Sequence, residues 1–267
     1  MITIIFSKDR SMQLDLCLKS LYANCGEYMD IHVLYTCSND RHEKSYEILK
    51  KEHKFVDFVR EIDFKSDLLR LLHDKMHILF CTDDCIFTRP FSMNEVVNML
   101  DENIDSIGFS LRLGVNTTIC YSANAIQNVP PCVKIKENVL MYGWYKADLD
   151  FGYPLELSSS VYRVHDINPI LYNLDYSNPN ELEWIMYCSL NAYREYKPLL
   201  ICYENSIAFC NPLNRVQNLN NNRCGNKYSS DWLLTEFEKC GRIDIEPFIG
   251  FIPTGAHEEK EIIIGYS

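Results

Sequence analysis

Residues 77–90 read HILFCTDDCIFTRP, and this stretch decides how we interpret the rest of the chain. The apolar run before Thr82 is typical of a short buried strand, and two carboxylates, Asp83 and Asp84, follow it directly. Mg²⁺ and Mn²⁺ prefer oxygen ligands and complete their coordination with substrate phosphates, so such a strand end suits a divalent cation. A solvated acidic turn after a core strand is the alternative, and the flanking elements have to decide between the two.

The residues before this stretch alternate between strand and helix patterns. We expect strands at 2–6, 31–36 and 55–59, and helices at 11–21, 41–53 and 68–73. A strand followed by a helix, repeated three times and closed by a fourth strand, is typical of a parallel, doubly wound α/β sheet. The sequence therefore predicts an α/β fold in which the stretch at 77–82 is an inner strand.

Polar residues follow each of these predicted strands. In open α/β sheets ligands bind outside the carboxyl ends of the strands, although polar ends are expected of any such sheet. Asn39 or Asp40 suits the edge of a base, Arg10 or Lys65 suits a phosphate, and Asp84 suits a metal. We therefore predict a nucleotide pocket that is formed from the strand-end residues Ser7, Asp9, Arg10, Asn39, Lys65, Asp83 and Asp84.

The overall composition disfavours several classes of partner. The 267 residues carry a formal net charge of −11, which disfavours nucleic acid and leaves a small anionic ligand open. No apolar run approaches the about 18–20 residues of a membrane helix, and residues 8–10 interrupt the N-terminal apolar run, so we expect no signal peptide. Twelve cysteines without a CxxC pair argue against a zinc site or a disulfide scaffold and favour a reducing, cytoplasmic setting, with several thiols buried.

The middle of the chain contains fewer clear patterns. A strand over 104–111 is expected to end at Arg112, and residues 116–137 read as a long loop, a type of segment that is usually functional or mobile. The aromatic run at 142–153 suits sugar binding beside carboxylates, and burial in the core is the alternative for Trp144. Residues 158–163 are expected to lead into a helix over 166–173.

A predicted helix over 178–196 carries the candidate general base. Asn178 is a suitable cap and Pro179 a suitable first residue. Glu181 and Glu183 fall in the first two turns, where the helix dipole stabilises carboxylates. Capping alone accounts for Glu181, whereas Glu183 points to another face and is a candidate base if that face meets the cleft.

Two late segments contain further candidate ligands. Residues 211–228 are rich in asparagine and have little to bury. Within them, Asn214, Arg215 and Arg223 are candidates to close over a phosphate. His257 lies in a late loop between small residues and acids, where it is either a structural side chain or a contact to a metal or phosphate.

These features, taken in order, resemble nucleotide-sugar glycosyltransferases of the GT-A type, and among them the large family 2 group. The first strand runs into the polar turn 7–10 and an amphipathic helix, as in that family. The second strand ends at residues 38–40, where the family places base-binding acids. The fourth ends in Thr82-Asp83-Asp84, which is similar to the DxD motif, with Thr82 in place of its first acid. The resemblance covers residues 1–110 well and the rest in general layout.

This resemblance implies a single Rossmann-like GT-A domain with a mixed, mainly parallel central sheet flanked by helices. Residues 1–110 would be its nucleotide-sugar-binding half and residues 111–267 its acceptor-binding half. Asp83 would contact the ribose and Asp84 the cation, Mn²⁺ or Mg²⁺, while Arg10 and Lys65 would lie near uracil or phosphate.

Other assignments rest on the layout of the family alone. Glu183 would be the base that deprotonates the acceptor, and His257 would complete the metal shell. Arg112, together with Asn214, Arg215 and Arg223, would belong to the loops around the diphosphate and the acceptor.

The reaction implied is transfer of a sugar from a nucleotide-diphosphate donor, with a UDP-sugar favoured, to a hydroxyl of a glycan or glycolipid. Inversion follows if Glu183 is the base, and retention if no base reaches the hydroxyl. One alternative is a sugar-nucleotide nucleotidyltransferase, although residues 7–13 contain no glycine for its phosphate loop. Thr82 keeps open a second alternative, a catalytically degenerate GT-A fold that acts as a binding module.

Overall fold

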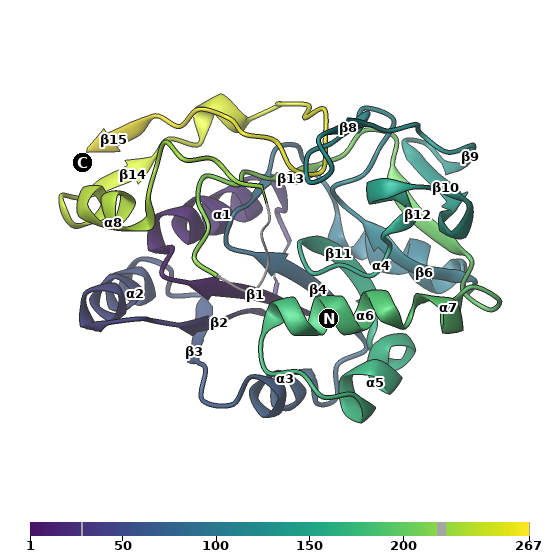
Figure 1. The fold of residues 1–267 in the computed structure, drawn as a ribbon, viewed down its shortest axis with the longest axis horizontal. Coiled ribbons are helices and arrows are strands. Elements are labelled where there is room, and N and C mark those ends of the chain that lie inside the picture. Colours follow the sequence, from purple (N-terminus) through teal and green to yellow (C-terminus); the bar gives the residue numbers. More distant parts are fainter. Residues whose placement is uncertain (28, 218–222, 267) are drawn as a thin grey trace.

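The structure is a computed structural model, and it describes residues 1–27, 29–217 and 223–266 (Figure 1). Part of the predicted phosphate loop, 218–222, therefore lies outside the described residues. Within the described residues, the largest sheet has nine strands in the order β3-β2-β1-β4-β11-β6-β12-β10-β9. Their bounds are β3 (Val56–Arg60), β2 (Ile31–Thr36), β1 (Ile2–Lys8), β4 (His77–Thr82), β11 (Ser159–Arg163), β6 (Ser106–Ser110), β12 (Leu199–Tyr203), β10 (Val139–Gly143) and β9 (Cys132–Lys136).

The strand directions confirm the predicted fold class. Strands β3, β2, β1 and β4 are parallel to one another, as the alternating pattern predicts. Strand β11 runs against both β4 and β6, whereas β12 is parallel to β6. Strand β10 runs against both β12 and β9. Only β11 and β10 oppose the common direction, so the sheet is mixed and mainly parallel.

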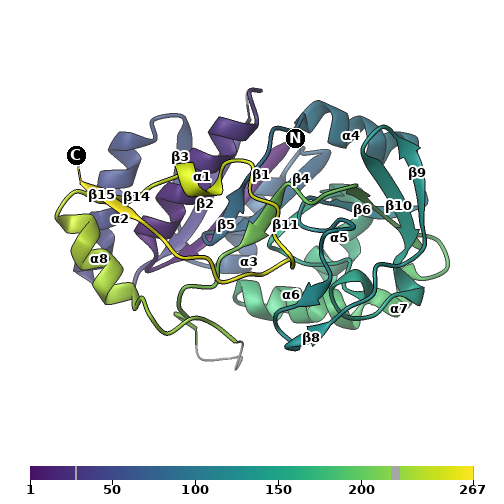
Figure 2. The same ribbon diagram turned by 90° about the horizontal axis from the view of Figure 1, so that it is seen from above.

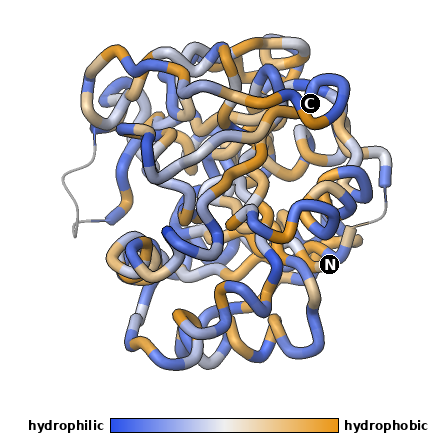
Figure 3. Tube along the Cα trace, turned by 90° about the vertical axis from the view of Figure 1, so that its right-hand side faces the viewer, coloured by the Kyte–Doolittle hydropathy of each residue, from blue (hydrophilic) through white to orange (hydrophobic). Residues whose placement is uncertain are grey.

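Helices cover both faces of this sheet. One hydrophobic core includes side chains of α1 (Ser11–Asn24), α2 (Asp40–Glu52), α4 (Met93–Glu102) and α8 (Ser230–Glu238). The other includes α3 (Phe64–Leu72), α5 (Val164–Asn173), α6 (Pro179–Cys188) and α7 (Leu190–Tyr193). Side chains alternate along a strand, so Ile5 of β1 packs into the first core while Ile4 and Phe6 pack into the second. Figure 3 shows hydrophobic segments gathered in the interior of the molecule.

Smaller elements complete the fold. Three helical turns, η1 (Trp144–Lys146), η2 (Leu149–Gly152) and η3 (Glu246–Phe248), connect larger elements. Two-stranded pairs are formed by β5 (Cys85–Phe87) with β13 (Ala208–Cys210), β14 (Gly241–Ile243) with β15 (Ile264–Tyr266), and β7 (Ile119–Cys120) with β8 (Ala125–Ile126). In Figure 2 the C-terminal segment, in yellow, passes over the molecule in the region of β5. Among the described residues, none of the helices combines the length and apolar character needed to cross a membrane.

Residues 158–163 lead into a helix as expected, but most of them also form the buried strand β11, which was not predicted. Its consecutive serines conceal the apolar pattern by which strands are recognised. Arg163 at its end is also buried, and its guanidinium donates to the carbonyls of Leu100 and Ser106 and to Asp166. These partners offset the cost of burying a charge. The helix after it, α5, is present as predicted, although it begins earlier, at Val164.

Two other predicted segments also needed correction. Residues 116–137 are not one loop, since they contain β7, β8 and β9, and β9 pairs with β10 at the edge of the sheet. The predicted helix over 178–196 is interrupted after Cys188, where the Ser189 hydroxyl donates to the Ile185 carbonyl. Such a bond competes with the backbone hydrogen bonds of the helix.

The third helix begins earlier than expected, at Phe64 and not at residue 68. The Asp63 side chain caps it by accepting from the Ser66 backbone amide at 2.8 Å. The aromatic run contains a core residue, because Trp144 is 5% exposed and its indole nitrogen donates to the Lys197 carbonyl at 2.7 Å. For Trp144 the alternative of burial is therefore correct.

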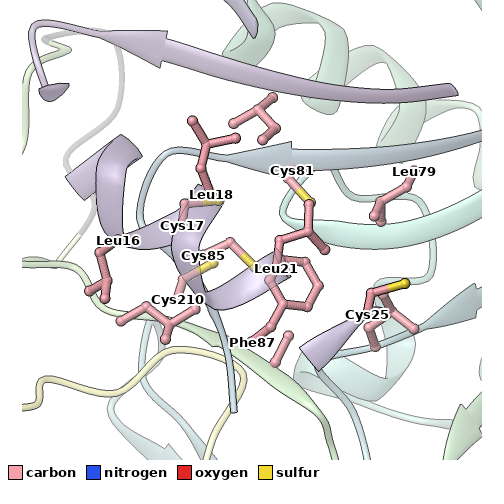
Figure 4. Close-up of a cluster of buried hydrophobic side chains, with 14 of the residues drawn as sticks. Leu16, Cys17, Leu18, Leu21, Cys25, Leu79, Cys81, Cys85, Phe87 and Cys210 are labelled. Atoms are coloured by element: carbon pink, nitrogen blue, oxygen red, sulfur yellow. The ribbon is translucent and has the colours of Figure 1, made fainter. Parts of the chain in front are cut away.

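The prediction that several thiols are buried is confirmed. All twelve cysteines are free, and seven of them are buried. Cys17, Cys81, Cys85 and Cys210 lie close together in the core beside α1 (Figure 4). Burial raises the pKa of the Cys17 and Cys81 thiols, so these groups stay protonated and pack as small apolar side chains.

Candidate active site

The carboxyl ends of β1 and β4 border a cavity of about 650 Å³. Phe6 and Thr82 are register partners, so the two strands reach this edge together. The volume lies within the range of about 300–1,000 Å³ that is usual for ligand sites. Of the predicted site residues, those that line the cavity are Ser7, Arg10, Asp83, Asp84, Glu183, Asn214, Arg215, Arg223 and His257.

Asp83 is a buried carboxylate at the floor of this cavity. It accepts hydrogen bonds from the Ser7 hydroxyl at 2.9 Å, the Lys8 amide at 3.3 Å and the Arg10 guanidinium at 3.0 Å. Burial raises the pKa of Asp83 to about 6, with Asp84 adding to the shift and Arg10 opposing it. The polar contacts hold the side chain in one place beside the end of β1.

Asp84 lies in the tight turn between β4 and β5. The Thr82 hydroxyl donates to its Oδ1 at 2.8 Å, and Arg10 Nη1 lies 3.5 Å from its Oδ2. Its backbone carbonyl accepts from the Asn211 amide at 2.9 Å. The carboxylate is thus held from both sides while it still borders the cavity, as a cation ligand requires.

Arg10 connects the acidic pair to a segment distant in the sequence. Its Nε donates to Asn214 Oδ1 at 2.9 Å, and its Nη2 donates to the Asn214 carbonyl. Burial disfavours the charged guanidinium, but Asp83 and Asp84 outweigh it and raise the pKa of Arg10. Arg10 therefore stays charged and brings the loop containing Asn214 over the cavity.

Glu183 reaches the cavity from the first turns of α6. The side chain of Asn178 caps this helix by accepting from the Glu181 amide at 3.0 Å, and Pro179 is its first residue, as predicted. Glu183 Oε1 accepts from the Leu157 amide at 3.2 Å. Burial, followed by the charge of Glu156, raises the pKa of Glu183 to about 7. A carboxylate with this pKa can accept a proton near neutral pH.

Arg112 and Glu156 form a buried ion pair close to Glu183. Both are at most 3% exposed, and Arg112 Nε lies 3.5 Å from Glu156 Oε2. Glu156 also accepts from the Ser158 amide and the Ser160 hydroxyl. In the described part of the chain, Arg112 is not among the residues that line the cavity. Its positive charge opposes the rise in the pKa of Glu183.

His257 lines the cavity on the side of the C-terminal segment. Residue 257 forms a backbone bridge with Cys210 of β13, which fixes its position next to β5. Its Nδ1 is buried and has no hydrogen-bond partner within the described residues. Burial opposes protonation of the ring, but Cys210 and Asp84 outweigh it and raise the pKa of His257.

The loop residues of the predicted site lie above the strand ends. Arg223 stacks its guanidinium 4.2 Å from the centre of the Tyr121 ring and donates to Asn124 Oδ1 at 2.6 Å. Asn214 Nδ2 donates to the Tyr228 carbonyl at 3.0 Å. Arg215 also borders the cavity. Arg215 and Arg223 line the same cavity as Asp83 and Asp84, and they provide cationic contacts for an anionic ligand.

Besides Arg112, three predicted site residues are absent from the cavity lining in the described chain, and each has another contact. Asp9, at a φ of 54°, accepts from the amide and hydroxyl of Ser38 and so joins the ends of β1 and β2. Asn39 caps α2 by accepting from two amides of its first turn. Lys65 Nζ donates to the carbonyls of Tyr172 and Leu174, near the end of α5, at 3.2 and 2.8 Å.

Several lining residues were not predicted from the sequence, among them Glu61, Tyr121, Ser122, Ser158, Asn178 and Asn180. The sequence predicted that Asn178 caps a helix, but it did not predict that Asn178 lines the cavity. Tyr121 and Ser122 fall in the segment at 116–137 that we expected to be a loop. A functional role was considered for that loop, but no residue in it was named as a ligand. Glu61 follows the third strand, whose polar end was expected to contribute.

Groups of three side chains able to hold a metal ion occur at two places in the described residues. They are Asp15 with Glu52 and His53, and Asp30 with His32 and Asp57. Neither group includes Asp84 or His257. The predicted cation site is therefore not among the groups of three that the described residues form.

The chain is similar in sequence to a glycosyltransferase. It is 26% identical over 250 residues to a protein of Dictyostelium discoideum described as the bifunctional glycosyltransferase pgtA. The alignment covers 82% of this chain and 32% of that protein, so the chain spans about a third of the length of this relative. This similarity confirms the resemblance to glycosyltransferases that the sequence motifs indicate. No family model matches the chain.

The chain also has weak similarity to solved structures. S. aureus TarS superposes with a TM-score of 0.49 at 16% identity and covers 79% of this chain and 36% of its own. The apo structure of the bifunctional enzyme WbbM has a TM-score of 0.37 at 10% identity, covering 75% of this chain and 45% of its own.

Proposed function

We propose that this chain is a glycosyltransferase that moves a sugar from a nucleotide-diphosphate donor, favourably a UDP-sugar, to a hydroxyl of a glycan or glycolipid. The observation that carries the proposal is the cavity at the carboxyl ends of β1 and β4. It is bordered by Asp83 and Asp84 on one side and by Glu183 on the other. An acidic pair for the donor and a separate carboxylate for the acceptor are the two groups that this reaction needs.

The donor would enter with its diphosphate toward Asp84 and the arginines of the loop. Asp83 is held by Ser7, Lys8 and Arg10, and in this proposal it accepts from the ribose hydroxyls. Residues 1–110 then supply most donor contacts and residues 111–267 the acceptor side, as the resemblance implies. Asp9 joins the ends of β1 and β2, Asn39 caps α2, and Lys65 connects α3 to residues near the end of α5.

A divalent cation fits the residues present. Asp84 borders the cavity with a carboxylate, and His257 Nδ1 is a buried ring nitrogen with no hydrogen-bond partner in the described chain. These two side chains would hold Mn²⁺ or Mg²⁺. When bound, the ion would neutralise charge on the leaving diphosphate.

Glu183 would act as the general base. Its carboxylate takes the proton of the acceptor hydroxyl while the acceptor oxygen bonds to the anomeric carbon. The bond between that carbon and the diphosphate oxygen breaks, and the nucleoside diphosphate leaves. Attack from the face opposite the diphosphate inverts the configuration at the anomeric carbon.

The donor site can be tested by calorimetry with UDP in the presence and absence of Mn²⁺. We expect the wild type to bind UDP more tightly with Mn²⁺, and Asp84→Ala to lose this gain. Asp105→Ala is a matched control, since Asp105 is exposed and far along the chain from the acidic pair. Unchanged Mn²⁺-dependent binding by Asp84→Ala would contradict the proposal.

Activity distinguishes an enzyme from a binding module. We expect slow release of UDP from at least one of UDP-glucose, UDP-galactose and UDP-N-acetylglucosamine when Mn²⁺ is present. If the protein binds UDP but releases no UDP from any of these UDP-sugars, the degenerate GT-A fold is favoured. In that case the site with Thr82 in place of the first acid would bind the nucleotide without catalysing transfer.

A further inference from the structure

Three aromatic side chains form a continuous track that begins beside Glu183 and ends in solvent. The rings of Tyr153 and Tyr187 stack with centres 5.2 Å apart and planes inclined by 26°. Trp184 continues the series, with its ring centre 5.7 Å from that of Tyr187 and an inclination of 33°. We call Tyr153, Tyr187 and Trp184 the aromatic track.

The outer part of the track is open to water. Trp184 is 62% exposed and Tyr187 is 43% exposed, whereas Leu182 and Met186 of the same helix are fully buried. Helix α6 thus packs on the core through its aliphatic side chains and presents its aromatic ones outward. Clustered aromatic rings on a surface mark binding sites more often than isolated apolar residues do.

The inner end of the track lies at the proposed base. Glu183 and Tyr187 are four residues apart in α6 and so share one side of the helix. Burial, followed by the neighbouring charge of Glu183, raises the pKa of Tyr153. The hydroxyl of Tyr153 therefore lies within the field of the Glu183 carboxylate. Glu183 itself lines the cavity, and Figure 1 shows α6, which carries Glu183, Trp184 and Tyr187.

We propose that the aromatic track binds the acceptor, and that the acceptor is a pyranoside whose ring packs flat on Trp184 and Tyr187. This inference rests on the proposed glycosyltransferase function. A pyranose has an apolar face of C–H groups and an edge of hydroxyls, so it can cover an aromatic ring while one hydroxyl points toward Glu183. Tyr153 would then donate to or accept from the sugar nearest the base.

The charge around the track favours a neutral ligand. Glu181 and Glu183 closely precede Trp184 in the sequence, and the whole chain carries a net charge of −11. An anionic membrane surface attracts basic segments, so this acidic helix face does not suit one. Tyr187 lies one helical turn from Glu183, the candidate base that lines the cavity, so a sugar hydroxyl is the group that the inner end of the track would present to this base.

The test uses the full chain saturated with UDP and Mn²⁺. Methyl β-D-glucopyranoside, methyl β-D-galactopyranoside, methyl α-D-mannopyranoside and cellotetraose are titrated, with tryptophan fluorescence and saturation-transfer NMR as readouts. We expect at least one glycoside to bind, and Trp184→Ala and Tyr187→Ala to weaken it by about tenfold or more. Tyr196→Ala is the matched control, because Tyr196 is 53% exposed and stacks on Tyr193 outside the track.

The outcomes separate this inference from the proposed function. If UDP does not bind the wild type at all, the proposed function fails. If UDP binds and none of the glycosides does, or if the track variants bind glycosides as the wild type does, only the aromatic track inference is overturned. Concentration-dependent dimers in sedimentation that disappear in Trp184→Ala would show that the track contacts a second copy, and would also overturn it.

Discussion

Thr82 Oγ1 donates a hydrogen bond to Asp84 Oδ1 at 2.8 Å. In the proposed resemblance to the DxD motif, Thr82 takes the place of the first acid. In this chain the position supplies a donor that orients the neighbouring carboxylate, and not a further negative charge. The replacement therefore leaves Asp84 better fixed, and it lowers the charge repulsion that a third acid would add beside Asp83.

This bond can be tested by Thr82→Val, which keeps the shape of the side chain and removes the hydroxyl. A hydrogen bond to a charged group is worth about 1.5–3 kcal/mol, so we expect Mn²⁺-dependent UDP affinity to fall by about tenfold or more. Calorimetry measures the effect, and Thr82→Ser, which retains the hydroxyl, should bind nearly as the wild type does. Equal affinity of the valine variant would mean that Asp84 needs no such orientation.

Glu183→Gln should separate donor binding from transfer. The amide keeps the size of the side chain and cannot take a proton, so we expect transfer to the acceptor to fall by about 10²–10⁴-fold. UDP affinity should stay within about twofold of the wild type. Parallel calorimetry and UDP-release assays measure the two quantities. A variant with full transfer activity would exclude Glu183 as the base.

The pH dependence of activity should reflect the pKa of Glu183, which burial raises to about 7. The ionised carboxylate is the active form, so kcat/KM should rise with pH and level off above about 7. The rate profile of the wild type over this range provides the measurement. A profile that is flat between pH 5.5 and about 7 would show that no group with this pKa limits the rate.

The same pKa also makes a prediction for stability. Because the folded state holds the Glu183 proton more tightly than the unfolded chain does, this group stabilises the fold at low pH and loses that contribution as pH rises toward about 7. Glu183→Gln has no such proton. The free energy of unfolding of Glu183→Gln minus that of the wild type, both measured in urea, should therefore increase as the pH rises from 5 to about 8.

The buried pair of Arg112 and Glu156 should matter for folding. Arg112→Leu leaves Glu156 buried without its cation, and the loss of one partner of a buried pair costs about 3–5 kcal/mol. Urea denaturation measures the change in the free energy of unfolding. We expect Arg112→Leu combined with Glu156→Gln to recover part of the loss. A single variant within about 1 kcal/mol of the wild type would contradict this account.

The first half of the fold was predictable because its apolar periods are clean. The strands at 2–6 and 77–82 are short apolar runs bounded by polar turns, and the structure confirms both of them with small changes in length. The capping signal at Asn178 was equally clear, and it correctly located the start of α6. Local chemistry determines these features, so a single sequence reveals them.

Tertiary contacts determine what the sequence did not reveal. Strand β11 is polar in composition and becomes a central strand only through pairing with β4 and β6. Lys65 and Arg112 were expected near a ligand because cations suit phosphates, yet each finds protein partners that lie far away in the chain. The aromatic run at 142–153 was expected to suit sugar binding, but its contact with α6 was not predicted, since Tyr153 and Tyr187 meet only in the folded chain.

The pairing of Phe6 with Thr82 has one more consequence. Side chains alternate across a strand, so a slip of one residue between β1 and β4 would exchange the faces of Ile4 and Ile5 and disrupt both cores. The same slip would separate Ser7 from Asp83. Correct register of the sheet and the hydrogen bond between Ser7 and Asp83 therefore form together, and a bound nucleotide would serve as a reporter of native register in refolding experiments.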